Sequence, residues 1–122
     1  MIILNDKRFS EERFCNVKNL EEIKNSPNNS TLIFQYSEND IPLYQFCKKN
    51  GVPYGVKISS IQEFIFIHNL NGKYVFVDDL DLAKTLQKLA DNYLSDTKII
   101  METSLKKIEK IALLEIDGIF VI

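Results

Sequence analysis

The stretch YVFVDDLDLAKTLQKLADNYL (Tyr74–Leu94) contains one complete unit of a strand followed by a helix. It opens with four apolar residues that end at Val77, and two aspartates follow at once. A short apolar run rich in β-branched and aromatic residues is typical of a buried strand. From Leu82 onward, apolar residues return every three or four positions, which places them on one face of a helix. We therefore expect a strand, a tight turn and a helix here.

The same unit recurs along the chain at a nearly regular interval. Apolar runs start at Thr31, Tyr54, Tyr74, Lys98 and Ile119, which are 23, 20, 24 and 21 residues apart. Their apolar residues are nearly continuous, as in strands that are buried on both faces of a parallel sheet. We predict an α/β fold with an open, mainly parallel sheet of about five or six strands and helices on both faces, a Rossmann- or flavodoxin-like three-layer sandwich. The alternative is half of a (βα)8 barrel.

The length of 122 residues suits one domain, which we assign to the whole chain, residues 1–122. Residues 31–122 contain the βα repeats, of about 22 residues each, and residues 1–30 are less regular. In this first part we expect a strand at MIIL (Met1–Leu4), an irregular segment or a hairpin at Asn5–Val17, and a short helix at Asn19–Asn25.

The composition is that of an ordinary soluble protein, with 45% hydrophobic residues, 26% charged residues and a net charge of −2. This charge gives no strong field for nucleic acid, and no apolar run approaches the roughly 20 residues of a membrane span. Two cysteines and one histidine are too few for a zinc site of about four N or S ligands, and we expect no cofactor. We expect a cytoplasmic protein with reduced thiols, in which Cys47 is a small buried residue.

The βα spacing of residues 31–122, with EIDGIFVI (Glu115–Ile122) at the end, resembles small bacterial proteins made of βα repeats that carry no assigned activity. The shared motifs are turn residues before strands and capping residues before helices, which any βα repeat requires. The resemblance therefore implies the fold of such proteins and no particular function.

The acids after the central strand, Asp78, Asp79 and Asp81, are similar to motifs of four enzyme or signalling families. VDD followed by TL resembles a phosphoribosyltransferase loop, but Leu82–Lys84 stands where that loop has glycines. The order of the acids departs from that of a response-regulator receiver, and the Gly-Thr that follows the haloacid-dehalogenase motif is absent. The DxD pattern of sugar-nucleotide transferases is too short to assign a function alone. We interpret Asp78 or Asp79 as the N-cap of the next helix, with Asp81 in its first turn.

A binding site of this fold is expected outside the carboxyl ends of the strands. Four charged residues near those ends are our ligand-binding candidates: Lys57, Asp78, Asp79 and Glu102. They suit a small polar ligand or one divalent ion with its water, although we assign no metal site. Lys57 interrupts an apolar strand, and we expect it to lie on an edge strand and to face solvent. The alternative is a partly buried lysine that pairs with Asp78 or Glu102.

The helix predicted in SSIQEFIFIHNL (Ser59–Leu70) has more apolar residues than one face can bury. We expect Ile65 to face the sheet, Ile67 to point outward, and His68 to lie on the surface near the helix end. The excess apolar area predicts a contact surface, most simply in a twofold homodimer. The interface candidates are Phe64, Phe66, Ile67 and Leu70.

Two function classes follow from these observations. The sequence lacks a histidine cluster, a recognisable nucleophile and a phosphate-binding loop, which favours a non-catalytic binding or assembly module that self-associates. The alternative is a small enzyme or ligand-binding protein with a polar or divalent-metal site at the carboxyl ends of the strands. Catalytic residues stay unassigned.

Overall fold

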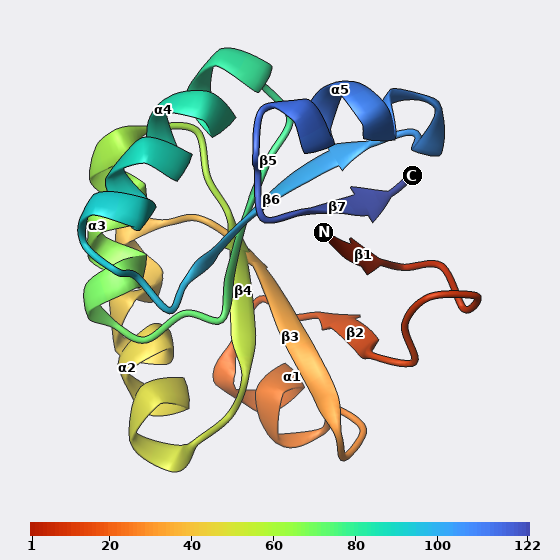
Figure 1. The fold of residues 1–122 in the computed structure, drawn as a ribbon. Coiled ribbons are helices and arrows are strands. Elements are labelled where there is room, and N and C mark those ends of the chain that lie inside the picture. Colours follow the sequence, from red (N-terminus) through yellow and green to blue (C-terminus); the bar gives the residue numbers. More distant parts are fainter.

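Every strand of the protein lies in one parallel sheet, in the order β1-β7-β6-β5-β4-β3-β2 (Figure 1). The computed structural model describes residues 1–122. The strands are β1 (Ile2–Leu4), β2 (Arg13–Asn16), β3 (Ser30–Gln35), β4 (Tyr54–Lys57), β5 (Tyr74–Val77), β6 (Lys98–Thr103) and β7 (Gly118–Val121). The helices are α1 (Leu20–Lys24), α2 (Ile41–Asn50), α3 (Ile61–Asn69), α4 (Leu80–Asn92) and α5 (Ile108–Leu113), with short 3-10 turns η1 (Glu38–Asp40) and η2 (Leu105–Lys107). None of these helices has both the length and the apolar character needed to cross a membrane.

The helices cover one face of the sheet. From β2 to β7, each crossover leads to the next strand in the same direction, and right-handed crossovers then place every helix on the same face. Figure 1 shows α2, α3 and α4 together on the side of the sheet away from β1 and β2. The predicted α/β fold with a parallel sheet is confirmed. The prediction of a three-layer sandwich, with helices on both faces of the sheet, is wrong. The sheet curls in one direction, as in the alternative of a half barrel.

The sheet has seven strands because an additional strand, β2, forms in the first part of the chain. All five apolar runs that start from Thr31 onward are strands, and the strand and helix expected near residues 2 and 20 also form. β2 lies within Asn5–Val17 and pairs in parallel with β3, so this segment is not a hairpin. Its four residues, RFCN, contain two apolar side chains between polar ends, a pattern too short to indicate a strand.

The inner face of α3 differs from the expected one. Phe64 and Ile67 are fully buried, whereas Ile61 and Ile65 are 41% and 39% exposed. The prediction that Ile67 points outward and Ile65 faces the sheet is therefore wrong. The chain turns back over Ile67 after the helix, because the Gly72 N–H donates to the Ile67 carbonyl at 3.0 Å. A Cβ at Gly72 would collide with the Ile67 side chain, so glycine permits this packing.

The remaining side chains of this region are partly buried. Phe66 and Leu70 keep some exposure, and Leu70 packs against the large core between helices and sheet. His68 is half-buried rather than free on the surface.

Cys47 is fully buried, as predicted, and burial raises the pKa of its thiol to about 11. Such a thiol is protonated at neutral pH and acts as a small apolar group.

The opposite face of the sheet encloses a small aromatic core. Phe14 of β2 lies 5.3 Å from Phe120 of β7 and 6.3 Å from Phe76 of β5, measured between ring centres. Phe76 and Phe120 are themselves 5.5 Å apart, with their planes at 81°. Edge-to-face packing of this kind is favourable because the positive ring edge meets the negative ring face. The sheet therefore curls until β2 meets β7 through side chains.

Two strand glycines leave the space that this core and its neighbouring strand require. A Cβ at Gly55 would lie 2.5 Å from the Phe76 ring. At Gly118, a Cβ would lie 2.5 Å from the carbonyl oxygen of Ile2, which belongs to the adjacent strand β1. Glycine at these positions lets the aromatic ring and β1 approach the sheet closely.

The corrected inner face of α3 is tested by a pair of substitutions. Ile67→Lys should destabilise the protein by about 3 kcal/mol or more, because it buries an unpaired charge and removes core packing. Ile65→Lys should change the free energy of unfolding of the monomer by about 0.5 kcal/mol or less, because its side chain does not pack in the core of the chain. Urea unfolding followed by circular dichroism measures both. Equal tolerance of the two lysines would contradict the packing of α3.

Candidate functional site

A layer of polar side chains lies above the aromatic core, at the carboxyl ends of the strands. Side chains alternate along a strand, so residues two positions apart share a face. Ile33 and Ile100 belong to the inner core, which places Gln35 and Glu102 on the same inner face. Lys57 faces inward for the same reason, two residues after Gly55, and is in register with Gln35. In closed (βα)8 barrels and in open α/β sheets alike, ligand sites lie at this end of the strands.

Lys57 and Glu102 form an ion pair that leaves most of their hydrogen-bonding capacity unused. Their nearest N and O atoms are 3.6 Å apart, and the side chains are 41% and 17% exposed. Neither side chain makes a hydrogen bond within the protein, and the same is true of the Gln35 amide. The expectation of an edge strand from which Lys57 faces solvent is wrong, because β4 lies between β3 and β5. The alternative, a lysine paired with Glu102, is found.

The aspartates after β5 do not gather around this pair. The Asp79 carboxylate accepts a hydrogen bond from the Leu82 N–H at 3.1 Å, so Asp79 is the N-cap of α4, as interpreted from the sequence. Asp81 lies in the first turn of that helix. Asp78 is exposed and makes no side-chain hydrogen bond or ion pair. No group of three or more histidine, cysteine, aspartate or glutamate side chains is placed to hold a metal ion.

A second polar cluster, at the amino ends of the strands, is centred on Glu12. The Glu12 carboxylate accepts hydrogen bonds from the hydroxyl groups of Thr31 and Tyr74, at 2.5 and 2.6 Å, and from the Lys73 ammonium at 2.9 Å. It thereby ties the segment before β2 to the starts of β3 and β5. Burial disfavours the charged carboxylate, but these bonds together more than compensate, and the pKa of Glu12 is lowered. Burial and the bond to Glu12 raise the pKa of the Tyr74 hydroxyl.

The Glu12 cluster stabilises the folded protein at neutral pH. A lowered folded-state pKa means that this stabilisation is complete above the ordinary glutamate pKa of 4.5 and is lost as the pH falls through the lower value.

Sequence reasoning missed Glu12, because a single acid in an irregular segment has no pattern. The available signal was indirect: Thr31 and Tyr74 are polar groups at the starts of buried strands, and buried polar groups need partners.

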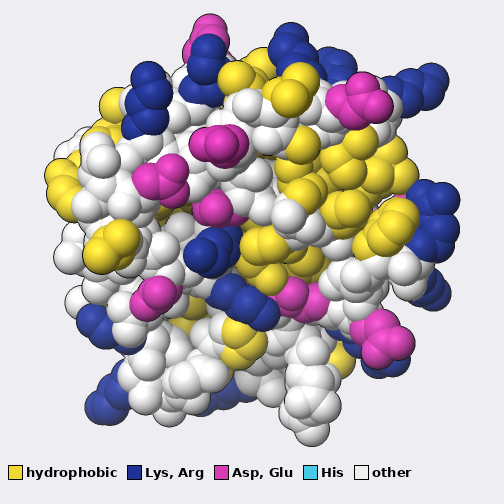
Figure 2. Space-filling view, in the orientation of Figure 1, with side chains coloured by type: hydrophobic (Ala, Val, Ile, Leu, Met, Phe, Trp, Pro, Cys, Tyr) yellow, Lys and Arg dark blue, Asp and Glu magenta, His cyan; other side chains and the backbone are white.

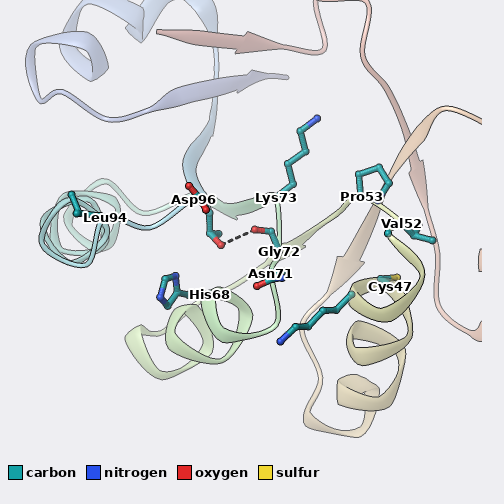
Figure 3. Close-up of a pocket in the computed structure, with 12 residues that line it drawn as sticks. Cys47, Val52, Pro53, His68, Asn71, Gly72, Lys73, Leu94 and Asp96 are labelled. Atoms are coloured by element: carbon teal, nitrogen blue, oxygen red, sulfur yellow. Dashed lines mark hydrogen bonds between the residues drawn. The ribbon is translucent and has the colours of Figure 1, made fainter.

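A cleft of about 520 Å³ also lies at the amino ends, between the loops that follow α2, α3 and α4 (Figure 3). Its histidine, threonine and two lysines all have protein partners. The Nδ1 atom of His68 lies 2.7 Å from the Ser95 hydroxyl, and its ring stacks on Phe64 and Tyr93. The other three pairs are Thr97 with the Gly72 carbonyl, Lys48 with the Asn69 carbonyl, and Lys73 with Glu12. These contacts join the loops to one another.

Figure 3 shows Lys73 pointing away from the other labelled residues of the cleft, which agrees with its bond to Glu12. The dashed line in the same view joins Thr97 to the Gly72 carbonyl. The cleft therefore offers few free polar groups that converge. Of the polar clusters, the carboxyl-end layer is the one in which paired, inward-facing side chains keep free donors and acceptors.

The sequence matches no model of a known protein family, and no curated protein is similar to it.

Proposed function

We propose that this protein binds a small polar ligand at the carboxyl ends of its strands, between Lys57 and Glu102. The ion pair of these two side chains supports the proposal, since it is inward-facing and makes no hydrogen bond. An ammonium group has three donors and a carboxylate has about four acceptor positions, so a ligand can bond to both without displacing a protein partner. The Gln35 amide, in register with Lys57, adds one more donor group and one more acceptor.

The contrast between the two ends of the sheet supports a binding role over a structural one. Glu12 at the amino end has a hydroxyl or ammonium donor on both carboxylate oxygens, as buried charges in stable cores do. Glu102 is similarly shielded, with 17% of its side chain exposed, but only the distant Lys57 compensates its charge. Ligands of parallel α/β sheets bind at the carboxyl ends of the strands, which is where these incompletely bonded groups lie.

The proposed location is the cytoplasm. Both cysteines, Cys15 and Cys47, have free thiols, which persist under the reducing conditions of that compartment.

Amide-shift NMR with mixtures of small sugars, carboxylic acids and amines tests the proposed site. The amides that shift should belong to the carboxyl ends of β3, β4, β5 and β6. Lys57→Met should remove these shifts because it keeps the length of the side chain and loses its donors. Lys49→Met, which changes an exposed lysine of α2, is the matched control and should preserve them. Shifts that gather at the amino-end cleft, or survive Lys57→Met, would contradict the proposal.

Self-association remains a second candidate, now on a different face of α3. Ile61 and Ile65 lie one turn apart and are both about two-fifths exposed, and Phe66 beside them is partly exposed. A partner surface would remove this apolar area from water, which favours association. We propose a twofold homodimer through this face.

Light scattering at micromolar concentration should give about twice the chain mass of 14.2 kDa, and Ile65→Lys should return the monomer without unfolding it. Gln62→Lys, on the exposed surface of the same helix, is the control for added charge. A wild-type monomer throughout this range would rule out the dimer.

A further inference from the structure

The charges of the carboxyl-end layer favour a ligand without net charge. Lys57 is the single cation among its inward-facing residues, and Glu102 already lies 3.6 Å from it. An anionic ligand that binds Lys57 would have to compete with Glu102, and a cationic ligand that binds Glu102 would have to compete with Lys57.

A hydroxyl group fits the pair without this conflict. One hydroxyl accepts a hydrogen bond and donates another, so it can lie between an ammonium donor and a carboxylate acceptor. The 3.6 Å separation of the two charged groups leaves them in mutual attraction but without a direct hydrogen bond. Neighbouring hydroxyls of the same ligand can then bond to the Gln35 amide, which both donates and accepts.

An apolar surface adjoins these polar groups. Phe120 is in register with Glu102 and is only partly buried, although its ring packs on Phe14 and Phe76. Figure 2 shows apolar side chains gathered over the region of β7 and β1, with positively and negatively charged side chains beside them. A ligand whose C–H groups lie against an aromatic ring while its hydroxyls meet charged groups uses both surfaces.

We propose that the ligand is a neutral polyhydroxy compound, a sugar or a polyol, held between Lys57, Glu102 and Gln35. This inference rests on the proposed binding function and specifies its ligand class. Lys57 donates to ligand oxygens, Glu102 accepts from ligand hydroxyls, and the Phe120 ring supports the apolar side of the ligand.

Isothermal titration calorimetry with two sets of compounds tests this inference. The neutral set is D-ribose, D-glucose and myo-inositol, and the anionic set is inorganic phosphate, D-ribose 5-phosphate and citrate. At least one neutral compound should bind, and D-ribose 5-phosphate should not bind more tightly than D-ribose. Lys57→Met and Glu102→Gln should each weaken neutral binding by about tenfold or more, since each removes hydrogen bonds to a charged group. Lys49→Met, the exposed control, should leave it unchanged.

The possible failures separate the ligand class from the binding function. Suppose that an anion binds more tightly, loses affinity in Lys57→Met and gains it in Glu102→Gln. The neutral class would then be wrong, while a ligand site at Lys57 would stand. If no compound of either set binds, or if binding persists in both variants, the ligand class and the binding function are both overturned. The melting temperature of each variant shows that it is folded before titration.

Discussion

Packing of Phe14 against Phe120 inside the curled sheet is the contact on which the arrangement of this protein depends. The two rings belong to β2 and β7, and no hydrogen bonds join the strands on the two sides of the opening, β1 and β2. Burying a phenylalanine side chain contributes about 1.5–3 kcal/mol, comparable to several net hydrogen bonds. A flat sheet would leave the inner face in water, because the crossovers put every helix on the other side. Curling around the aromatic core removes that face from water without a second layer of helices.

This closure makes the two ends of the inner face different. At the amino end, the segment between β1 and β2 returns along the opening, and its Glu12 closes the core with bonds to Thr31, Lys73 and Tyr74. At the carboxyl end no such segment supplies partners, so Lys57 and Glu102 face each other with free donors and acceptors. The candidate site therefore follows from the topology. The curled sheet encloses the aromatic core, and the polar layer at the amino end has hydrogen-bond partners within the protein, whereas the layer at the carboxyl end has none.

The repeat of strands and helices could be predicted because each unit, such as Tyr74–Leu94, contains its own run of apolar strand residues and its own helical spacing of apolar residues. The cap at Asp79 was predictable for the same reason, since a cap depends on residues close in sequence. The single covered face could not be predicted, because it depends on the order of strands, which local patterns do not specify. The inner face of α3 depends on the contact of Ile67 with Gly72, five residues away across a turn. Lys57 and Glu102 were recognised as candidates, but their meeting depends on the curl of the sheet.

The central claim is that the polar layer at the carboxyl end is free for a ligand, whereas the one at the amino end is structural. Two isosteric substitutions, Glu12→Gln and Glu102→Gln, compare them directly in urea unfolding at neutral pH. Glu12→Gln should lower the free energy of unfolding by about 1–3 kcal/mol, because it weakens three bonds to a partly buried carboxylate. Glu102→Gln should change it by about 0.5 kcal/mol or less, because Glu102 makes no hydrogen bond and its one partner, Lys57, is partly exposed. An equal or larger loss for Glu102→Gln would show that the Lys57 pair stabilises the fold and would contradict the account.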